Sequence, residues 1–336
     1  MNDSIHQPVS HPMTSPEKVS RLREVVGPED TLAILINADP DAMASAIAFK
    51  RLFWRKIKKV LIYRVNSIQR TDNLAFVKLL RIKQYPVRSI NPTHITKWAI
   101  LDSQPHHHEA FMKVPVDIII DHHPLDPSSK ADYMDIREHY GANATILTEY
   151  LLAAKIRPSR RLATALFYGI KTDTDNFVRA SILNDVSAFR YLYRYTNMHI
   201  VKKIESSEMT QKTLASYKIA MERLILFKNM AIVHMDEVEN PDILVIIADF
   251  FLRLAETTWS IVSGINKGKL IIIFRNAGFR GDAGKTAQRL FGGWGASAGG
   301  HKDSARAEIP MAGLLKEMKS ESDSGQFVLN ILKTSK

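Results

Sequence analysis

Acidic side chains and histidines occur at four places in the first half of the sequence, each close to the end of an apolar stretch. The four places are Asp39 and Asp41 in "NADPDAM", Asp102 in "AILDSQP", Asp121, His122 and His123 in "IIIDHHP", and Asp173 and Asp175 in "GIKTDTDNF". Carboxylates and imidazoles bind divalent metal ions and transfer protons in catalytic sites. If the fold gathers these four places, the sequence predicts a metal site.

Each cluster taken alone also has a purely structural interpretation. The Asp-Pro-Asp segment can be an N-cap followed by an acidic first helical turn, Asp102 can be a turn residue, and the paired histidines can lie on the surface. Taken together, however, several carboxylates at one edge of a sheet would repel one another unless a cation neutralised them. Oxygen-rich sites with imidazole suit manganese or magnesium better than zinc, and a carboxylate shared by two ions would activate water for attack on a phosphoryl group.

The elements that must position these residues alternate along the first half. Apolar strands are expected at residues 31–36, 60–65, 98–102 and 116–121, and amphipathic helices at 42–56, 73–81, 144–156 and 160–170. Short apolar strands that alternate with helices predict an α/β fold with a parallel sheet and helices on both faces. Ligands of such sheets bind at the carboxyl ends of the strands, where the acidic clusters stand.

The second half predicts a separate unit. Residues 186–227 are charged, helical in pattern and free of Pro and Gly, so we expect a helical connector. A smaller α/β domain at 228–336 follows, with a hairpin through "NKG" and a glycine-rich loop, "FGGWGASAGGH". The expected division is therefore a polar N-terminal tail at 1–25, a metal-binding domain at 26–185, the connector, and the C-terminal domain.

Composition limits the classes of protein that remain. A length of 336 residues suggests two domains, and the absence of cysteine excludes disulfides, thiolate metal sites and cysteine nucleophiles. The first twenty residues lack an apolar stretch and the most apolar window carries Asp249, so we expect a cytoplasmic protein without a secretory signal or membrane span. The formal charge of +11 favours a nucleotide or nucleic acid partner over solubility alone.

The order of the four acidic segments resembles the motifs of the DHH phosphoesterase superfamily, which includes RecJ-type exonucleases, family II pyrophosphatases and cyclic-dinucleotide phosphodiesterases. The glycine-rich "FGGWGASAGGHKDSARAEIP" and Arg275 in "IIIFRNAG" resemble the DHH-associated domain type 1. The resemblance covers roughly residues 30 to 312. Five motifs in order are far more specific than one Asp-His-His tripeptide.

The resemblance implies a role for each matching residue. It implies that two Mn²⁺ ions are bound, with Mg²⁺ as the alternative, and that the second domain holds the substrate across a cleft. The implied metal ligands are Asp39 for one ion, Asp41 for the other, Asp102 as a bridge between them, and His122 and Asp173 completing the second ion's ligands. The implied catalytic residues are Asp121 and His123, which support the ligands and reach the phosphate, and the implied substrate-binding residues are Arg275, Gly299, Gly300 and His301.

One position departs from the family pattern. Many relatives carry a histidine where this sequence has Leu35, and RecJ-like members carry an aspartate where it has Asn37. An amide oxygen can bind a metal but brings no charge, so the first ion is expected to bind more weakly unless one of the histidines at 106–108 replaces the ligand. Those histidines can equally form a solvated turn. Trp294 in the glycine-rich loop is open to two interpretations, base stacking or ordinary packing.

These observations predict an enzyme that hydrolyses short oligoribonucleotides or small nucleotides through metal-activated water, similar to the nano-RNase and pAp-phosphatase group. Cyclic or linear dinucleotide phosphodiesterase activity is the alternative within that class. A nucleotide-binding protein of the same fold with weakened catalysis is the alternative outside it, and a basic nucleic-acid-binding module would leave the acidic edge unexplained. A homodimer is left open.

Overall fold

The computed structural model describes residues 13–179, 181–207, 210–278, 281–314 and 323–334. The chain divides into two compact units, Met1–Ser207 and Glu208–Lys336. The division falls inside the segment for which a helical connector was expected. Two of its helices, α7 (Leu183–Tyr193) and α8 (Met198–Ser206), pack against helices of the first unit, whereas α9 (Gln211–Glu222) packs within the second.

The first unit is built on a six-stranded sheet in which every neighbouring pair is parallel. Its strands, in spatial order, are β3 (Tyr85–Pro86), β2 (Lys59–Arg64), β1 (Thr31–Ile36), β4 (Lys97–Leu101), β5 (Ile118–Asp121) and β6 (Tyr133–Ile136). The expected α/β fold class is therefore confirmed. The chain order reverses between β1 and β4, which is where parallel sheets open a crevice at their carboxyl ends.

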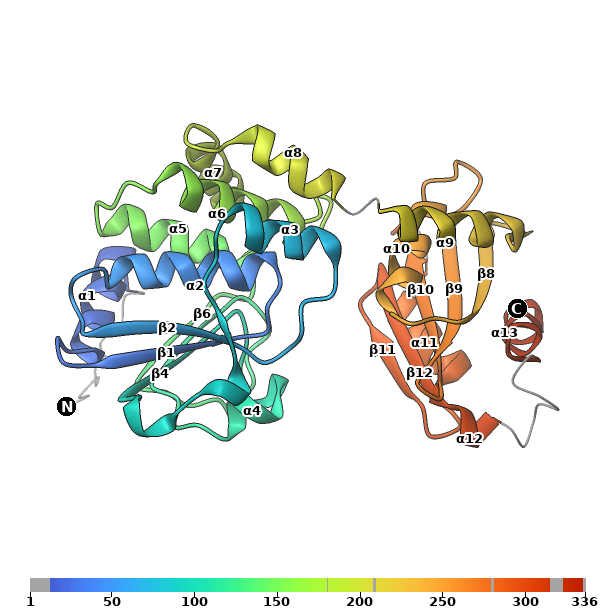
Figure 1. Cartoon of the computed structure of the whole chain (residues 1–336), viewed down its shortest axis with the longest axis horizontal. Helices are drawn as coiled ribbons and strands as arrows, with labels where there is room; N and C mark the ends of the chain where they lie inside the picture. Colours follow the sequence, from blue (N-terminus) through green and yellow to red (C-terminus); the bar gives the residue numbers. More distant parts are fainter. Residues whose placement is uncertain (1–12, 180, 208–209, 279–280, 315–322, 335–336) are drawn as a thin grey trace, which may run out of the picture. The chain divides into compact units, whose positions relative to one another are not determined.

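The helices of this unit cover the two faces of the sheet unequally. Figure 1 shows α2 (Pro40–Leu52), α5 (Asn143–Ala153) and α6 (Arg160–Asp173) on one face and the short α4 (Glu109–Met112) on the other. Helix α3 (Thr71–Leu79) packs against α8. Since β1 is buried along its whole length, its side chains are apolar on both sides, as expected for an interior parallel strand.

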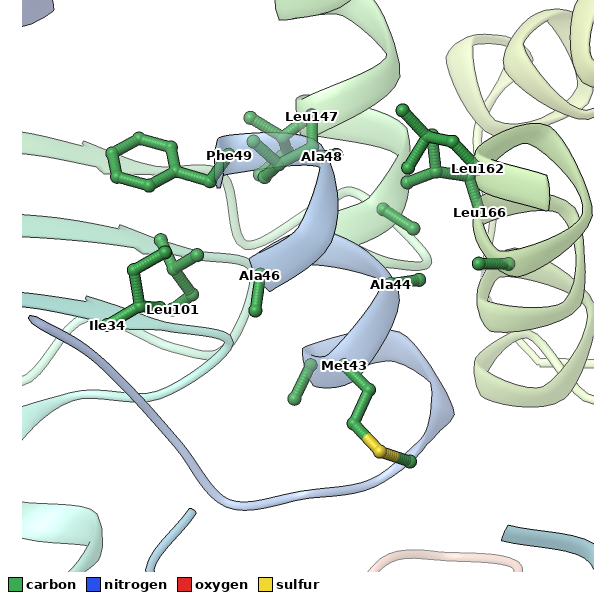
Figure 2. Packing of buried hydrophobic residues seen from close by; sticks show 14 of the residues in the cluster. Ile34, Met43, Ala44, Ala46, Ala48, Phe49, Leu101, Leu147, Leu162 and Leu166 are labelled. Carbon is green, nitrogen blue, oxygen red and sulfur yellow. The ribbon is translucent and has the colours of Figure 1, made fainter. Parts of the chain in front are cut away.

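Helix α2 lies between the sheet and the outer helices and is buried for most of its length. Ala44, Ala46 and Ala48 present only methyl groups, which allows the neighbouring backbones to approach closely (Figure 2). Figure 2 also shows Phe49 near strand residue Ile34 and the side chains of α6 packed from the other side. This packing fixes the position of the first turn of α2, which carries Asp39 and Asp41.

The expected polar tail at 1–25 is wrong for the part that the structure describes. Residues Ser15–Val25 form helix α1, which buries Val19 and Leu22 against the first unit's core. A capping box between Thr14 and Glu17 starts this helix, and Lys18 forms an ion pair with Asp135 of β6. Residues 1–12 lie outside the described part of the chain.

The second unit is a mixed six-stranded sheet covered on both faces. Its strands, in spatial order, are β11 (Ser297–Gly300), β12 (Ser304–Pro310), β10 (Lys269–Asn276), β9 (Trp259–Asn266), β8 (Met230–Glu237) and β7 (Ile225–Phe227), and only β8 and β9 pair in parallel. Helices α9 and α10 (Asp242–Phe251) cover one face, and α11 (Ala283–Phe291), α12 (Met311–Leu314) and α13 (Ser324–Thr334) cover the other. The hairpin expected at "NKG" joins β9 and β10. Among the described residues, none of the helices is both long and apolar enough to cross a membrane.

Candidate metal centre

The structure gathers the acidic clusters at the carboxyl edge of the first sheet. Asp39 follows β1, Asp102 follows β4 and Asp121 ends β5, and these three strands are neighbours in the sheet. In the β4–β5 register Leu101 pairs with Ile120, so Asp102 and Asp121 come to the same edge. Strand order thus brings three of the four places together, and the fourth, Asp173, comes from the C-terminal end of α6.

Asp39 and Asp41 belong to the start of α2. Asp39 is its N-cap and accepts a 2.8 Å hydrogen bond from the Ala42 amide, so the structural interpretation of this residue is also correct. Asp41 is buried, and its two oxygens accept hydrogen bonds of 2.7 and 2.8 Å from the backbone amides of Asn143 and Ala144. Helix α5 begins at Asn143, so its N-terminus holds the Asp41 carboxylate in place.

Two carboxylate oxygens in the centre are buried and accept no hydrogen bond from the residues that the structure describes. They are Oδ1 of Asp102 and Oδ2 of Asp173, the last residue of α6. Each faces His122, whose Nε2 lies 3.3 Å from the Asp102 oxygen and 3.0 Å from the Asp173 oxygen. Asp102 also has a φ of 58°, a left-handed conformation that is uncommon outside glycine and is enriched at constrained functional positions.

The hydrogen bonding of His122 decides what the ring can offer. Its Nδ1 lies 3.0 Å from the carbonyl oxygen of Tyr140, which can only accept, so Nδ1 carries a proton. In a neutral ring Nε2 then presents its lone pair to the unpaired oxygens of Asp102 and Asp173. Lone pairs that converge in this way need either a second proton on His122 or a cation between them, and the protonated Nδ1 bound to a carbonyl is the usual support of a metal-binding histidine.

The charge distribution is that expected of a cation-binding site. Although burial opposes it, the neighbouring carboxylates of Asp102, Asp173 and Asp41 raise the pKa of His122 to about 12. Loss of surrounding water, helped by the charge of Asp173, raises the pKa of Asp39 to about 6, although this residue keeps part of its surface exposed. Burial raises the pKa of Asp41 and of Asp102 well above the usual range, and neighbouring carboxylates raise both further.

Two groups of side chains have the spacing of metal ligands. Asp41, His122 and Asp173 each place one ligand atom within 4.8 Å of the others, and so do Asp102, His122 and His123. Both groups contain carboxylate oxygens and imidazole nitrogen, the donor set that Mn²⁺ accepts. The residues present therefore fit a divalent cation, and the unpaired oxygens give the direct structural reason.

His123 is held by a buried acid. Asp121 is fully buried and accepts hydrogen bonds from the His123 ring at 2.8 Å, from the His122 amide at 2.8 Å and from Gln104 Nε2 at 2.8 Å. These partners lower the pKa of Asp121 in spite of its burial, with His123 giving the largest lowering effect. The proton of the His123 ring is thereby fixed on Nδ1, and Nε2 is left to accept a proton or contact a ligand.

Among the three consecutive histidines, only His107 lies against the centre. Its ring centroid is 5.5 Å from that of His123, and its Nδ1 lies 3.2 Å from Ser103 Oγ. His106 instead pairs with Asp126 at 2.8 Å, and His108 caps α4 by accepting from the Ala110 amide. Their turn is the 3-10 helix Pro105–His107, so the expectation of a partly solvated turn also holds for His106.

The two departures from the family pattern lie in different surroundings. Leu35 is fully buried in the apolar cluster on the α4 face of the sheet, where it packs with Trp98 and Phe111. Asn37 is exposed just after β1, on the edge that carries the acids.

In the second unit, the predicted substrate-binding residues gather at one end of the sheet. Arg275 pairs with Ser304 in the β10–β12 register, and the Ser304 carbonyl accepts a 2.7 Å hydrogen bond from the His301 amide. Gly300 has a φ of 149°, and a Cβ there would lie 2.4 Å from the Ser304 oxygen, so only glycine fits. Arg275 also pairs with Asp249 of α10 at 2.5 Å, an interaction that the sequence did not predict.

Three further residues shape the centre without having been predicted. Gln104 is buried and ties Asp121 to the following loop, because its Oε1 also accepts from the Asp126 amide. Asn143 is buried beside Asp41 with no hydrogen bond to its side-chain amide from the described residues. Gly169 of α6 lies so close to α2 that a Cβ would be 3.2 Å from the Asp41 Cα.

The comparisons with known proteins agree with this arrangement. The sequence model of the DHH family N-terminal domain matches residues 32–170, which contain five of the predicted metal-site residues and the Asp-His-His tripeptide. Residues 32–170 are therefore a DHH family N-terminal domain. The matched residues include all of the candidate ligands except Asp173, which follows three residues after the match ends.

Two further proteins extend the comparison beyond that domain. The uncharacterized protein MJ1633 of Methanocaldococcus jannaschii is 37% identical over 277 residues, which cover 82% of this chain and 57% of that protein. The chain thus spans 57% of the length of this curated relative. The crystal structure of an exopolyphosphatase-related protein from Bacteroides fragilis superposes with a TM-score of 0.70 at 15% identity, covering 92% of this chain and 95% of that one. At this identity the superposition establishes a shared fold.

Proposed function

We propose that this protein is a phosphoesterase that binds two divalent ions, preferentially Mn²⁺, and hydrolyses short oligoribonucleotides or small nucleotides. One observation carries the proposal. A histidine whose Nδ1 proton is committed to a carbonyl points Nε2 at two buried carboxylate oxygens that have no other partner among the described residues. The converging oxygens need a positive charge beside them, and a bound divalent cation would supply it without a second proton on His122.

The ligands in this proposal divide into two groups around Asp102. Asp41, His122 and Asp173 would hold one ion, since their ligand atoms lie close together. Asp39 would hold the other, and Asp102 would contribute to both. When bound, such ions lower the pKa of water and neutralise the charge that develops on a phosphoryl group.

His123 is the residue of the chain best placed to contact the phosphate. Asp121 fixes its ring through Nδ1, and its side chain remains 43% exposed, so Nε2 can reach a ligand from solvent. Once Nε2 has taken up a proton, a histidine held in this way can donate a hydrogen bond to a phosphate oxygen or give that proton to the leaving oxygen. Asp121 acts through His123, because its own carboxylate is completely buried.

We assign substrate recognition to Arg275, Gly299, Gly300 and His301 of the second unit. Gly299 has no atom near its missing side chain, so its backbone can be approached closely by an anion. His301 is exposed, and a guanidinium and an imidazole supply charge-assisted hydrogen bonds to phosphate. The pairing of Arg275 with Asp249 implies that Arg275 must share or exchange this partner when a phosphate binds.

A nucleotide-binding protein with weakened catalysis is the second candidate. The observation that favours it is the neutral, exposed Asn37 together with Leu35 turned into the apolar core, because neither supplies a charged ligand to the first ion. Under that alternative Asp41, His122 and Asp173 would still bind a metal ion.

A turnover screen distinguishes the two candidates and the substrate classes. The protein with Mn²⁺ is offered a two-to-five-nucleotide RNA, adenosine 3′,5′-bisphosphate, linear and cyclic dinucleotides, and pyrophosphate. We expect hydrolysis of the short RNA or the bisphosphate, and loss of that activity in Asp102→Asn. Nucleotide binding without turnover of any of these compounds would favour the second candidate, and hydrolysis of pyrophosphate alone would contradict the assignment of substrate.

A further inference from the structure

A concave surface lies in the first unit at the end of α2 that is far from the metal centre. It is a pocket of about 640 Å³ formed where the C-terminal end of α2, the loop after α3 and the N-terminal end of α6 meet. Lys50 in its wall lies nine positions after Asp41 along the helix, which corresponds to roughly 14 Å at 1.5 Å per residue. The pocket is therefore distinct from the metal centre, and its volume lies in the range of small-molecule sites.

The rim of this pocket is strongly basic. Five of the residues that line it are cations, and none is acidic; the cations are Lys50, Arg51, Arg81, Lys83 and Arg161. Among the residues that the structure describes, no ion pair joins Arg51, Arg81, Lys83 or Arg161 to a carboxylate. Burial lowers the pKa of the Lys50 ammonium, and the nearby charges of Lys83 and Lys59 lower it further. Unneutralised cations that repel one another around a cavity are relieved by an anion.

The inner wall of the pocket is apolar. Ile62, Leu80, Ile82 and Leu162 line it and are buried. Trp54 adds an aromatic face at the rim and is 58% exposed, although tryptophan is usually largely buried. The guanidinium of Arg55 lies 6.0 Å from the centroid of the Trp54 ring, a distance at the limit of cation–π contact.

From this combination we propose that the pocket binds a nucleotide, with the phosphate among the cations and the base against Trp54 and the apolar wall. Cations alone would serve any anion, and an apolar hollow alone would serve any small apolar group. A phosphate joined to a flat aromatic base uses both parts of the surface, and base stacking on an exposed aromatic ring is the common mode of single-strand recognition. The nucleotide can be free or can be one residue of a single-stranded RNA.

Binding is measured in EDTA, so that the metal centre does not contribute. The probe is a five-nucleotide oligoadenylate with a fluorescent 5′ label, followed by fluorescence anisotropy, with adenosine monophosphate and inorganic phosphate as competitors. We expect the variant Lys83→Glu/Arg161→Glu to weaken binding at least about tenfold, since charge-assisted hydrogen bonds are lost and repulsion replaces them. Competition by adenosine monophosphate assigns the site to free nucleotide, and binding of the oligonucleotide alone assigns it to single strands.

Two controls keep the test specific. Arg190→Glu reverses an exposed charge on α7, away from the pocket, and should change affinity less than about twofold. Trp54→Ala should weaken binding of the oligonucleotide several-fold, whereas Trp54→Phe should largely preserve it. Because Trp54 is exposed, these variants keep the core intact and still test the proposal if the double variant does not fold. Unchanged affinity in the double variant, an equal loss in Arg190→Glu, or inorganic phosphate competing as well as adenosine monophosphate would overturn the proposal. Because no turnover is involved, its failure would leave the proposed hydrolase activity untouched.

Discussion

Replacing Gly169 by alanine tests how closely α6 must approach the metal centre. The added Cβ would lie 3.2 Å from the Cα and Oδ1 of Asp41 and 3.3 Å from the carbonyl oxygen of Pro40. These distances are a few tenths of an ångström shorter than ordinary contacts, so the first turn of α2 must move. The carboxylate of Asp41 would then be displaced relative to the amides of Asn143 and Ala144, which hold it now.

The expected effects on stability and on metal binding differ. Overpacking a core costs about 1–3 kcal/mol, whereas alanine is favoured over glycine in a helix by about 1 kcal/mol, so the free energy of unfolding should fall by about 0–2 kcal/mol. Displacing a group that supports a ligand lowers metal affinity by about 10–100-fold. We therefore expect Gly169→Ala to remain folded and to bind Mn²⁺ at least about tenfold more weakly.

Two assays on the same preparation separate these effects. Urea unfolding gives the stability, and calorimetric titration of Mn²⁺ into the EDTA-stripped protein gives the affinity. Gly293→Ala is the matched control, because a Cβ at Gly293 meets no atom within 4 Å. Mn²⁺ affinity within twofold of the wild-type value in Gly169→Ala would refute the reasoning that the close approach of α6 positions Asp41.

Three further predictions concern residues around and beyond the centre. Gln104→Ala removes hydrogen bonds to Asp121 and to the Asp126 amide, so we expect the free energy of unfolding in urea to fall by about 2–3 kcal/mol and kcat to decrease. Full activity of this variant would show that Asp121 needs no such support. In spite of the burial of Asp135, Arg137 and Lys18 lower the pKa of its carboxyl. The wild type should therefore have a larger free energy of unfolding than Asp135→Asn, with the full difference above about pH 4 and a smaller one as the pH falls through the lowered pKa. A difference that grows in acid would contradict this prediction. Arg275→Ala and His301→Ala should keep Mn²⁺ affinity and lose about 10–100-fold in kcat/KM on nucleotides, with a smaller loss on bis-p-nitrophenyl phosphate, whereas equal losses on both substrates would place the two residues in the chemistry.

The sequence predicts those parts of the fold that depend on local patterns. The strands at 31–36 and 269–274 are nearly continuous apolar runs, and the acidic residues follow such runs directly, so strand ends and acids could be placed together. Helix α1 was missed because only a few apolar residues stand among charges in "SPEKVSRLREV", although its capping-box residues are visible in the sequence. The strands β3 and β6 are two and four residues long, too short for alternation to show.

The supporting residues of the centre could not be predicted because their roles depend on tertiary contacts. Asn143 and Ala144 reach Asp41 across more than a hundred residues, and nothing in "GANAT" indicates that its amides meet a carboxylate. Gly169 looks like an ordinary helical glycine until α2 packs against it. Likewise, only the fold distinguishes His107, which lies against His123, from its two neighbours.

Calorimetric titration of Mn²⁺ into stripped wild-type protein and Asp102→Asn tests the central claim most directly. Asparagine keeps the size of the side chain and tolerates the left-handed φ of 58° at this position, so the change removes charge with little strain. For the wild type we predict two binding events, one tight and one distinctly weaker, because Asn37 and Leu35 supply no charged ligand to the first ion. For Asp102→Asn we predict loss of the tight event together with loss of hydrolysis. Unaltered Mn²⁺ binding in that variant would contradict a metal centre built around Asp102.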